Sequence, residues 1–318
     1  MIKALAITGP TASGKTALSI AVAEYVGAEI ISCDSMQIYR GMDIGTAKAT
    51  AEERAAVPHH LIDVVSPAED FSAEAYRKLA IPTAREISER GRIPMFVGGT
   101  GLYIDTVMRA ESDSVPESSR EYRDEMTARI KTDADIDALW QRLAEVDPES
   151  AGQIHKNNVR RVIRALEIYD MTGKPKSYFD RLSREKNPEI SVGMITLDFH
   201  NRENLYSRVD ARVDEMIKSG LVGEVSALYG AGLLKDEYTA AQAIGYKEII
   251  SALRGEISLA DAGELIKLST RRYAKRQLTW FRHEEDAYRI YIDTECGKMR
   301  KFEDILSEAK DIVKRIYQ

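Results

Sequence analysis

Residues 9–16 have the glycine, lysine and threonine spacing of a phosphate-binding loop. In such a loop, main-chain N–H groups surround an anion at the start of a helix. The Lys15 ammonium would add positive charge, and the Thr16 hydroxyl is a suitable Mg²⁺ ligand. The motif by itself favours a nucleoside triphosphate, and so a nucleotide-binding, ATP-binding protein. The loop residues are Gly9, Pro10, Thr11, Ala12, Ser13, Gly14, Lys15 and Thr16.

Two further polar residues follow apolar segments. Asp34 follows Ala28–Ser32, where it could bind Mg²⁺, act as a general base or cap a helix. Thr100 lies in the glycine turn Val97–Gly101, which could also be a plain turn. Ligands of an open α/β sheet bind beyond the carboxyl ends of its strands, so we expect Asp34 and Thr100 beside the phosphate loop.

The adjacent histidines His59 and His60 are a weaker candidate. Neighbouring side chains rarely converge on one metal ion, so a loop or packing role is favoured over a metal site.

The elements that must position these residues are predicted from apolar runs and glycine stops. Lys3–Thr8, Ala28–Ser32 and the segment from Ile93 into the glycine turn are predicted as buried strands. A helix is predicted to end at Gly27, and another, interrupted or kinked at Pro82, to end at Gly91. This alternation predicts an α/β fold with a parallel sheet flanked by helices.

The middle of the chain has a different pattern. Residues 111–189 are charged and helical in spacing, and predict an all-helical insertion. The core would then comprise residues 1–110 and 190–318, with further strands at 190–199 and 288–293 and a closing helix near the C-terminus.

Composition gives broader limits. The 318 residues are 44% hydrophobic and 30% charged, with two cysteines far apart and no apolar run long enough for a membrane span. A strand is predicted at the start of the chain, so we expect no signal peptide, a cytoplasmic location and no membrane partner. The net charge of −6 disfavours a nucleic-acid partner, although binding depends on local patches.

Two predicted helices carry such patches. Each helix places its cations on one arc, opposite an apolar arc. Each also contains pairs of like charges four residues apart, and a bound polyanion would reduce the repulsion between them. A solvated face is the alternative to RNA binding. The cations are Lys156, Arg160, Arg161 and Arg164 in one helix, and Arg271, Arg272, Lys275, Arg276 and Arg282 in the other.

Taken together, these motifs resemble the tRNA dimethylallyltransferases (tRNA isopentenyltransferases) of bacterial type. The chain departs from that pattern at Ala49 and Lys156, where members often have proline. The matching segments occur in family order and span nearly the whole chain: Gly9–Thr16, Asp34–Lys48, Pro58–Asp63, Val97–Tyr103, Asn157–Glu167, Thr172–Pro175, Ala243–Glu248 and Arg271–Arg282.

The resemblance implies a P-loop NTPase-like fold and transfer of a dimethylallyl group from its diphosphate to the adenosine 3′ of a tRNA anticodon. Asp34 would be the general base, Thr100 would lie at the reaction centre, and Arg208 would hold the diphosphate, with Arg212 as second choice. Mg²⁺ on Thr16 would assist, and the protein would be a monomer whose insertion contacts the anticodon arm.

The residues expected to contact tRNA are Asp34, Ser35, Met36, Gln37, Thr100, Arg123, Arg160, Arg161, Arg164, Gly245, Tyr246, Lys247, Arg271, Arg272, Lys275, Arg276, Gln277, Trp280 and Arg282. The alternatives are a small-molecule kinase, which leaves both basic faces unexplained, and an RNA-binding nucleotide switch, which lacks its expected Asn-Lys-x-Asp motif.

Overall fold

The structure is a computed structural model that describes residues 1–110, 119–182 and 185–317. It divides into two compact units, Met1–Val107 with Glu189–Gln318, and Met108–Pro188. The expected division was at 110/111 and 189/190. Among the described residues, every helix is too short or too polar to cross a bilayer.

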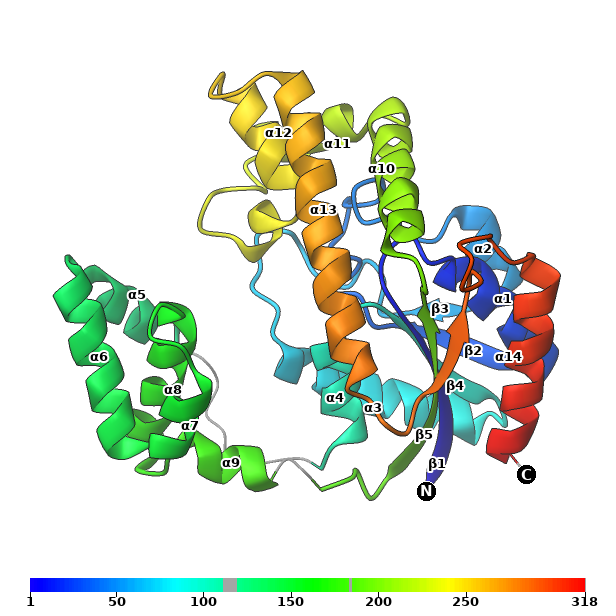
Figure 1. Cartoon of the computed structure of the whole chain (residues 1–318), viewed down its shortest axis with the longest axis horizontal. Helices are drawn as coiled ribbons and strands as arrows, with labels where there is room; N and C mark the ends of the chain where they lie inside the picture. The colour runs from blue at the N-terminus through cyan, green and yellow to red at the C-terminus, as the bar shows by residue number, and fades with distance from the viewer. Residues whose placement is uncertain (111–118, 183–184, 318) are drawn as a thin grey trace. The chain divides into compact units, whose positions relative to one another are not determined.

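The first unit is built on one six-stranded sheet whose paired strands are all parallel, in the order β3-β2-β4-β1-β5-β6 (Figure 1). The predicted α/β class with a helix-flanked parallel sheet is therefore confirmed. Because β1 is central, the phosphate loop that follows it lies in the middle of the carboxyl edge. The strands are β1 Ile2–Thr8, β2 Ala28–Ser32, β3 His59–His60, β4 Ile93–Gly98, β5 Ile190–Asp198 and β6 Tyr288–Tyr291.

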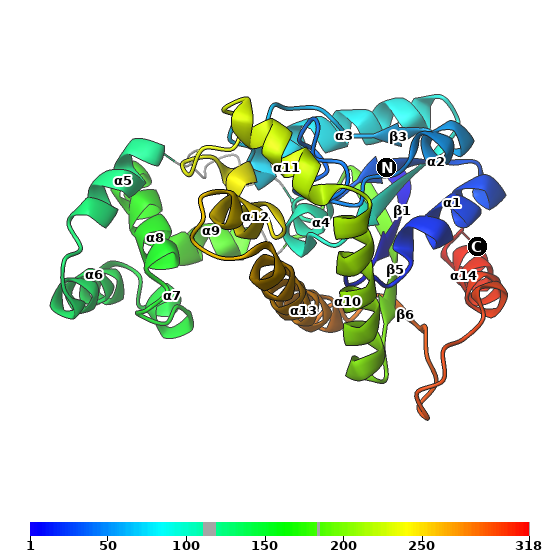
Figure 2. The same cartoon turned by 90° about the horizontal axis from the view of Figure 1, so that it is seen from above.

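Helices cover both faces of this sheet. α1 (Lys15–Val26) and α14 (Phe302–Tyr317) lie side by side on one face, and α3 (Ala73–Glu89) and α4 (Gly101–Met108) lie on the other (Figure 2). α1 ends where predicted, at Gly27, which has a φ of +70°.

A second group of helices rises beyond the carboxyl ends of the strands (Figure 1). It has its own apolar cluster, which includes Tyr39, Val213 and Ile249. These helices form a layer above the phosphate loop, although α10 and α13 also contribute Leu205, Val209, Ala274 and Leu278 to the core of the sheet. They are α10 Arg202–Lys218, α11 Leu221–Gly230, the 3₁₀ turn Thr239–Gln242, α12 Tyr246–Leu253 and α13 Leu259–Arg282.

The second unit contains helices and no strand among its described residues. Leu143, Val162 and Leu166 are fully buried between its helices and form a small independent core. The helices are α5 Arg120–Ala128, α6 Asp133–Val146, α7 Pro148–Gln153, α8 Val159–Thr172 and α9 Lys176–Leu182.

Two local expectations need correction. Pro82 does not interrupt its helix, since α3 is one continuous helix that begins after the Ser72 cap. The segment Pro58–Asp63 is more than a loop, because His59 and His60 form the short edge strand β3. The six-residue helix α2 (Ala51–Ala56) follows a capping box at Thr50.

Candidate active site

A cavity of about 470 Å³ lies at the carboxyl edge of the sheet in the first unit. Its lining includes the phosphate loop, Asp34 and the glycine turn after β4. These three loops were expected to share one site, and the structure brings them together. Helices α10 and α13 close the cavity from above with Arg212, Tyr273 and Gln277.

The phosphate loop has the backbone that its glycines predict. Gly9 has a φ of +139°, and a side chain there would meet the Leu197 carbonyl oxygen at 2.7 Å. Gly14 has a φ of +91° and immediately precedes α1. The buried Ser13 hydroxyl has no hydrogen-bond partner among the described residues. The loop thus offers an anion a helix N-terminus and an unpartnered hydroxyl.

Lys15 is partly buried in this loop. Its Nζ donates to the Pro10 carbonyl oxygen at 2.6 Å. The pKa of Lys15 is lowered to about 7, mainly by burial and also by the Arg212 charge, while Asp34 opposes the shift. A bound anion would favour the protonated ammonium, so this lysine is suited to bind phosphate oxygens.

The two arginines of α10 are four residues apart and have different roles in the structure. The Arg208 Nε donates to the Ala12 carbonyl oxygen at 2.7 Å, so Arg208 supports the phosphate loop. Arg212 lines the cavity. Burial lowers the pKa of Arg212; the neighbouring Asp34 opposes this shift and Arg208 adds to it. The geometry therefore favours Arg212 for direct contact with a ligand.

Asp34 begins a tight turn. Its Oδ1 accepts hydrogen bonds from the main-chain N–H groups of Met36, at 2.9 Å, and Gln37, at 3.4 Å. No hydrogen bond to its Oδ2 is found among the described residues. One oxygen thus holds the turn, as in a helix cap although no α-helix starts here, and the other remains available on a carboxylate that lines the cavity.

Thr100 lies directly behind the cavity wall. The lining from this turn consists of Val97, Gly98 and Gly99, not of Thr100, which was expected to face the cleft. The Thr100 hydroxyl oxygen accepts from the Ser35 N–H at 3.1 Å. Thr100 therefore binds the residue that follows Asp34.

Gln277 joins the phosphate loop to the glycine turn. Its Oε1 accepts from the Thr11 N–H, and its Nε2 donates to the Gly99 carbonyl oxygen, both at 2.9 Å. A side chain at 99 would meet that Nε2 at 2.1 Å, so Gln277 would have to move and give up this hydrogen bond. Beside it, burial raises the pKa of Tyr273 to about 12, so its hydroxyl stays protonated.

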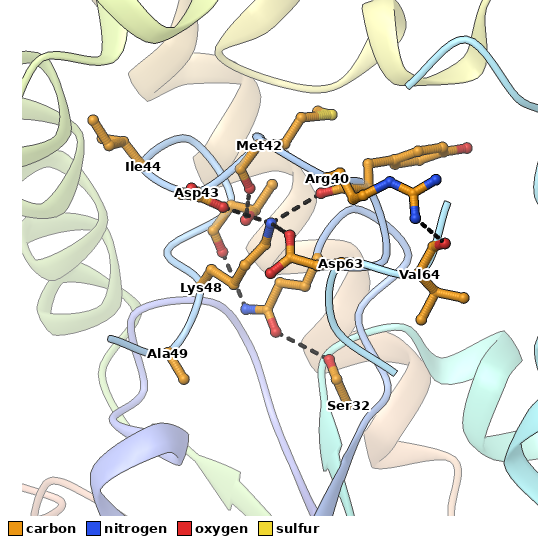
Figure 3. Close-up of polar contacts among 12 residues, drawn as sticks. Ser32, Arg40, Met42, Asp43, Ile44, Lys48, Ala49, Asp63 and Val64 are labelled. Carbon is orange, nitrogen blue, oxygen red and sulfur yellow. Dashed lines mark hydrogen bonds and ion pairs between the residues drawn. The ribbon is translucent and has the colours of Figure 1, made fainter. Parts of the chain in front are cut away.

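The opposite wall is formed by a segment that sequence reasoning did not assign to the cavity, Gly45, Thr46 and Ala47. Figure 3 shows the buried Lys48 beside this wall, with its Nζ between Asp43 and Asp63. Residue spacing alone did not reveal that Ala47 has a positive φ or that the Lys48 side chain is only 1% exposed.

The paired histidines point to different partners. His60 Nε2 lies 2.7 Å from Glu29, and His59 Nδ1 lies 2.7 Å from the Val57 carbonyl oxygen. His59 also lines the cavity. The favoured packing role agrees with this arrangement.

The basic residues of α13 divide into paired and unpaired groups. Arg271 binds Asp210 at 2.6 Å, and Arg282 binds the buried Asp198 through two nitrogens. Arg272, Lys275 and Arg276 are exposed and form no ion pair among the described residues. Trp280 is 39% exposed on the same helix. The alternative of a solvated face paired with carboxylates thus fits Arg271 and Arg282. It does not fit the three cations that form no ion pair.

The second unit shows the same division. Arg164 binds Glu167, whose carboxylate is fully buried, and Lys156 binds Asp137. The remaining cations of interest are exposed and form no ion pair among the described residues: Arg123, Arg160 and Arg161.

The residues before and within α12 are partly enclosed. Tyr246 has no exposed surface, and its hydroxyl donates to Glu224 at 2.6 Å. Its ring packs on Gly45, where a side chain would meet it at 2.5 Å. Gly245 and Lys247 line the cavity. Any effect of Tyr246 on a nucleic acid would therefore come through the wall that it supports.

The site fits a Mg²⁺ ion that binds together with the phosphates of a substrate. No cluster of three or more potential protein ligands, whether His, Cys, Asp or Glu, occurs in the part of the chain that the structure describes. The Thr16 hydroxyl and the Asp34 carboxylate both line the cavity. Mg²⁺ commonly binds through one or two such oxygens together with phosphate.

Comparisons with known proteins agree with this geometry. A family described as IPP transferase matches residues 37–284. The chain is 49% identical to a tRNA dimethylallyltransferase of Thermoanaerobacter sp. (strain X514), over 92% of each chain. It is 44% identical to one of Pelotomaculum thermopropionicum, over 98% of this chain and 95% of the relative.

Solved structures give the same result. A full-length tRNA isopentenylpyrophosphate transferase from Bacillus halodurans is 41% identical, with a TM-score of 0.71 over 99% of this chain and 97% of that one. A eukaryotic dimethylallyltransferase acting on tRNA is 31% identical, with a TM-score of 0.77 over 92% of this chain and 74% of that one. With a family match over residues 37–284 and relatives aligned over nearly the whole chain, the chain belongs to the IPP transferase family.

Proposed function

We propose that this protein transfers a dimethylallyl group from dimethylallyl diphosphate to the exocyclic amine of an adenosine next to a tRNA anticodon. The observation that carries the proposal is the single cavity in which the phosphate loop, Arg212 and the Asp34 carboxylate meet. Membership of the IPP transferase family supports it.

The donor's diphosphate occupies the phosphate loop. Main-chain N–H groups, the Ser13 hydroxyl and the cations of Lys15 and Arg212 surround it. Arg208 keeps the loop in shape through Ala12. As the bond from the allylic carbon to oxygen breaks, its electron pair goes to the diphosphate, and these groups stabilise the growing negative charge.

Thr16, which lines the cavity, would hold Mg²⁺ on the diphosphate. When bound, the metal ion supplies positive charge to the leaving group. The loop therefore binds a leaving group rather than a group that is transferred.

Asp34 acts on the acceptor. The adenosine amine forms its bond to the allylic carbon and must lose a proton, which the free Oδ2 of Asp34 accepts. Oδ1 meanwhile stays bonded to the turn and fixes the orientation of the carboxylate. Thr100 supports the same turn through Ser35.

The acceptor base reaches this enclosed site by leaving its stack, which costs least in a single-stranded loop. Gln37 and its neighbours receive the base. The free cations Arg272, Lys275 and Arg276 of α13, with Arg160 and Arg161 of the second unit, bind the RNA backbone. The protein acts as a monomer in the cytoplasm.

The test is a transfer assay with tRNA and labelled dimethylallyl diphosphate, beside a parallel assay with labelled ATP. We expect labelled tRNA only from the first assay, with the label on the adenosine 3′ of the anticodon. Turnover of ATP without any prenylated tRNA would contradict the proposal and favour the kinase alternative.

A further inference from the structure

Lys48 is a buried cation outside the phosphate-binding groups. Its side chain is 1% exposed, and its Nζ has three partners: the Tyr39 carbonyl oxygen at 2.9 Å, and the carboxylates of Asp43 and Asp63, each at 2.6 Å (Figure 3). Arg54 binds the second oxygen of Asp63 at 3.0 Å. All three donor positions of the ammonium are therefore used.

These contacts fix the wall segment Gly45–Ala47 from the inside. Lys48 follows the segment directly, and its N–H also donates to the Asp43 carbonyl oxygen at 3.0 Å. Ala47 has a φ of +46°, a left-handed conformation that costs free energy in a residue with a side chain. The surrounding contacts hold this strained turn in place.

Gln37 connects the wall to the sheet. Its Nε2 donates to the carbonyl oxygens of Thr46 and Ala47, and its Oε1 accepts from the Ser32 hydroxyl at 3.0 Å. Gln37 is also the residue whose N–H binds Asp34. A shift of the wall would therefore be transmitted to the turn that orients the Asp34 carboxylate.

A buried ammonium is a costly means of stabilising a fold. Removing charges from water costs free energy that their attraction only partly returns, and a well-packed apolar side chain often serves as well. A cation with fixed directional partners instead specifies one geometry of the main chain around it. The geometry specified here is that of the cavity wall.

We propose that Lys48 is a positioning residue for the acceptor side of the reaction. It holds Gly45–Ala47 and Gln37 in the shape that receives the adenosine and aligns its amine with Asp34. None of its hydrogen-bond partners belongs to the phosphate loop or α10, so donor binding does not depend on it. The inference rests on the proposed transfer to adenosine.

The test is Lys48→Met, which keeps the length of the side chain and removes the charge. We expect kcat/KM for tRNA to fall by roughly 100-fold, since small misplacements at a reacting centre cost about that factor. The dissociation constant of inorganic diphosphate with Mg²⁺, measured by calorimetry, should stay within about twofold of wild type. Loss of diphosphate binding by a folded variant would overturn the proposal.

Arg300→Met is the matched control. Arg300 is a partly buried cation with one carboxylate partner, Glu308, and one main-chain partner, the Tyr291 carbonyl oxygen, and it does not line the cavity. Its loss should lower the melting temperature without changing KM for tRNA. An equal change of KM in this control would show a general effect of destabilisation and overturn the proposal.

Asp63→Asn covers the case in which Lys48→Met does not fold. It keeps Lys48 and an oxygen acceptor but removes one charge, so we expect a smaller rise of KM for tRNA with unchanged diphosphate binding. Normal tRNA kinetics in either folded variant, Lys48→Met or Asp63→Asn, would overturn the inference. Absence of transfer by the wild-type protein would instead contradict the proposed function.

Discussion

Asp34 shows how one carboxylate divides two tasks between its oxygens. Oδ1 is bonded to the N–H groups of Met36 and Gln37, and the carboxylate lines the cavity. Replacing Asp34 by a side chain of the same shape but without a basic oxygen should therefore separate the two tasks. The amide of asparagine keeps the first task and loses the second.

We therefore expect Asp34→Asn to lower kcat for transfer by about 10²–10⁴, the usual contribution of a general base. The dissociation constant for tRNA should change little, because the turn retains its acceptor. Single-turnover transfer and a filter-binding titration measure the two quantities. Near-normal turnover would exclude Asp34 as the base.

The two arginines of α10 give a second prediction. Arg212→Met should weaken diphosphate binding by about 1.5–3 kcal/mol, the usual contribution of a hydrogen bond to a charged group. Arg208→Met should weaken it less, since Arg208 acts through the Ala12 carbonyl oxygen. Calorimetry with Mg²⁺ and diphosphate compares the two. A larger loss at Arg208 would restore that residue as the direct contact.

Lys15 predicts a pH dependence. Its pKa of about 7 in the free protein means that the ammonium is increasingly neutral above pH 7, while a bound anion needs it protonated. Diphosphate affinity should therefore fall as pH rises from about 7 to 9, by up to about tenfold per pH unit. Binding at pH 8 should take up protons, seen as a buffer-dependent calorimetric enthalpy. Lys15→Met should abolish that uptake, and equal enthalpies in all buffers for wild type would refute the shift.

The same lowered pKa affects stability without ligand. Between pH 7 and the unfolded value near 10.5, the unfolded chain binds more protons at Lys15 than the folded one. This residue's contribution to the free energy of unfolding consequently becomes more favourable as pH rises through that window. The free-energy cost of holding the Lys15 ammonium in this loop without an anion is thus largest below pH 7.

At the scale of elements, α13 combines two surfaces. Toward the cavity it presents Gln277, which binds Thr11 and Gly99. Toward solvent it presents Arg272 and Lys275, and the exposed Arg276 also reaches the cavity lining, where it packs over the Tyr273 ring. The free cations are those whose charge an RNA backbone can neutralise without breaking an existing ion pair.

Arg272→Gln, Lys275→Gln and Arg276→Gln together should reduce the slope of log K against log salt for tRNA binding by roughly 2, since each phosphate contact contributes about 0.7–0.9. Arg271→Gln is the paired comparison, because it breaks the ion pair with Asp210 and should mainly lower stability. An unchanged salt slope in the triple variant would favour the solvated-face alternative.

Strong local patterns explain which elements were predicted. Ala28–Ser32 is an unbroken buried run and was placed with its correct bounds. β3 was missed because two histidines carry no strand pattern and pair only through β2. Gln277 was expected to contact tRNA from the family resemblance and not from the basic arc of its helix, yet its hydrogen bonds are to Thr11 and Gly99. Periodicity gives the face of a helix, not the partner across it.

That Gly45–Ala47 forms a wall of the cavity could not be predicted from the sequence, for a related reason. Its shape depends on Glu224, 180 residues away, whose carboxylate accepts from the N–H groups of Asp43, Ile44 and Gly45. It also depends on the buried Lys48, which looks in sequence like any surface lysine. Long-range polar contacts of this kind leave no periodic signal.

At the scale of the molecule, the cations are divided between two units with separate cores. Arg160 and Arg161 belong to the helical unit and, among the described residues, share no ion-pair partner with the cations of α13. Contributions from groups without shared partners are usually additive.

Arg160→Gln with Arg161→Gln should therefore weaken tRNA binding, and its cost in binding free energy should add to that of the α13 triple variant within about 0.5 kcal/mol. Diphosphate binding should be unchanged in the Arg160, Arg161 variant, because neither residue lines the cavity, whereas Arg276 of the triple variant does. Titrations at one salt concentration test this. Full tRNA affinity in the Arg160, Arg161 variant would remove the helical unit from the RNA-binding surface.

The length of α13 has a consequence for how this chain can diverge. The helix runs unbroken for 24 residues, or about 36 Å, and carries Gln277 and the exposed cations in one register. Inserting or deleting a single residue ahead of Arg271 would turn everything after it by about 100°. Gln277 would leave the glycine turn while the cations turned toward the protein. Descendants of this sequence can therefore exchange residue types along the helix, but insertions and deletions must fall in the loops outside it.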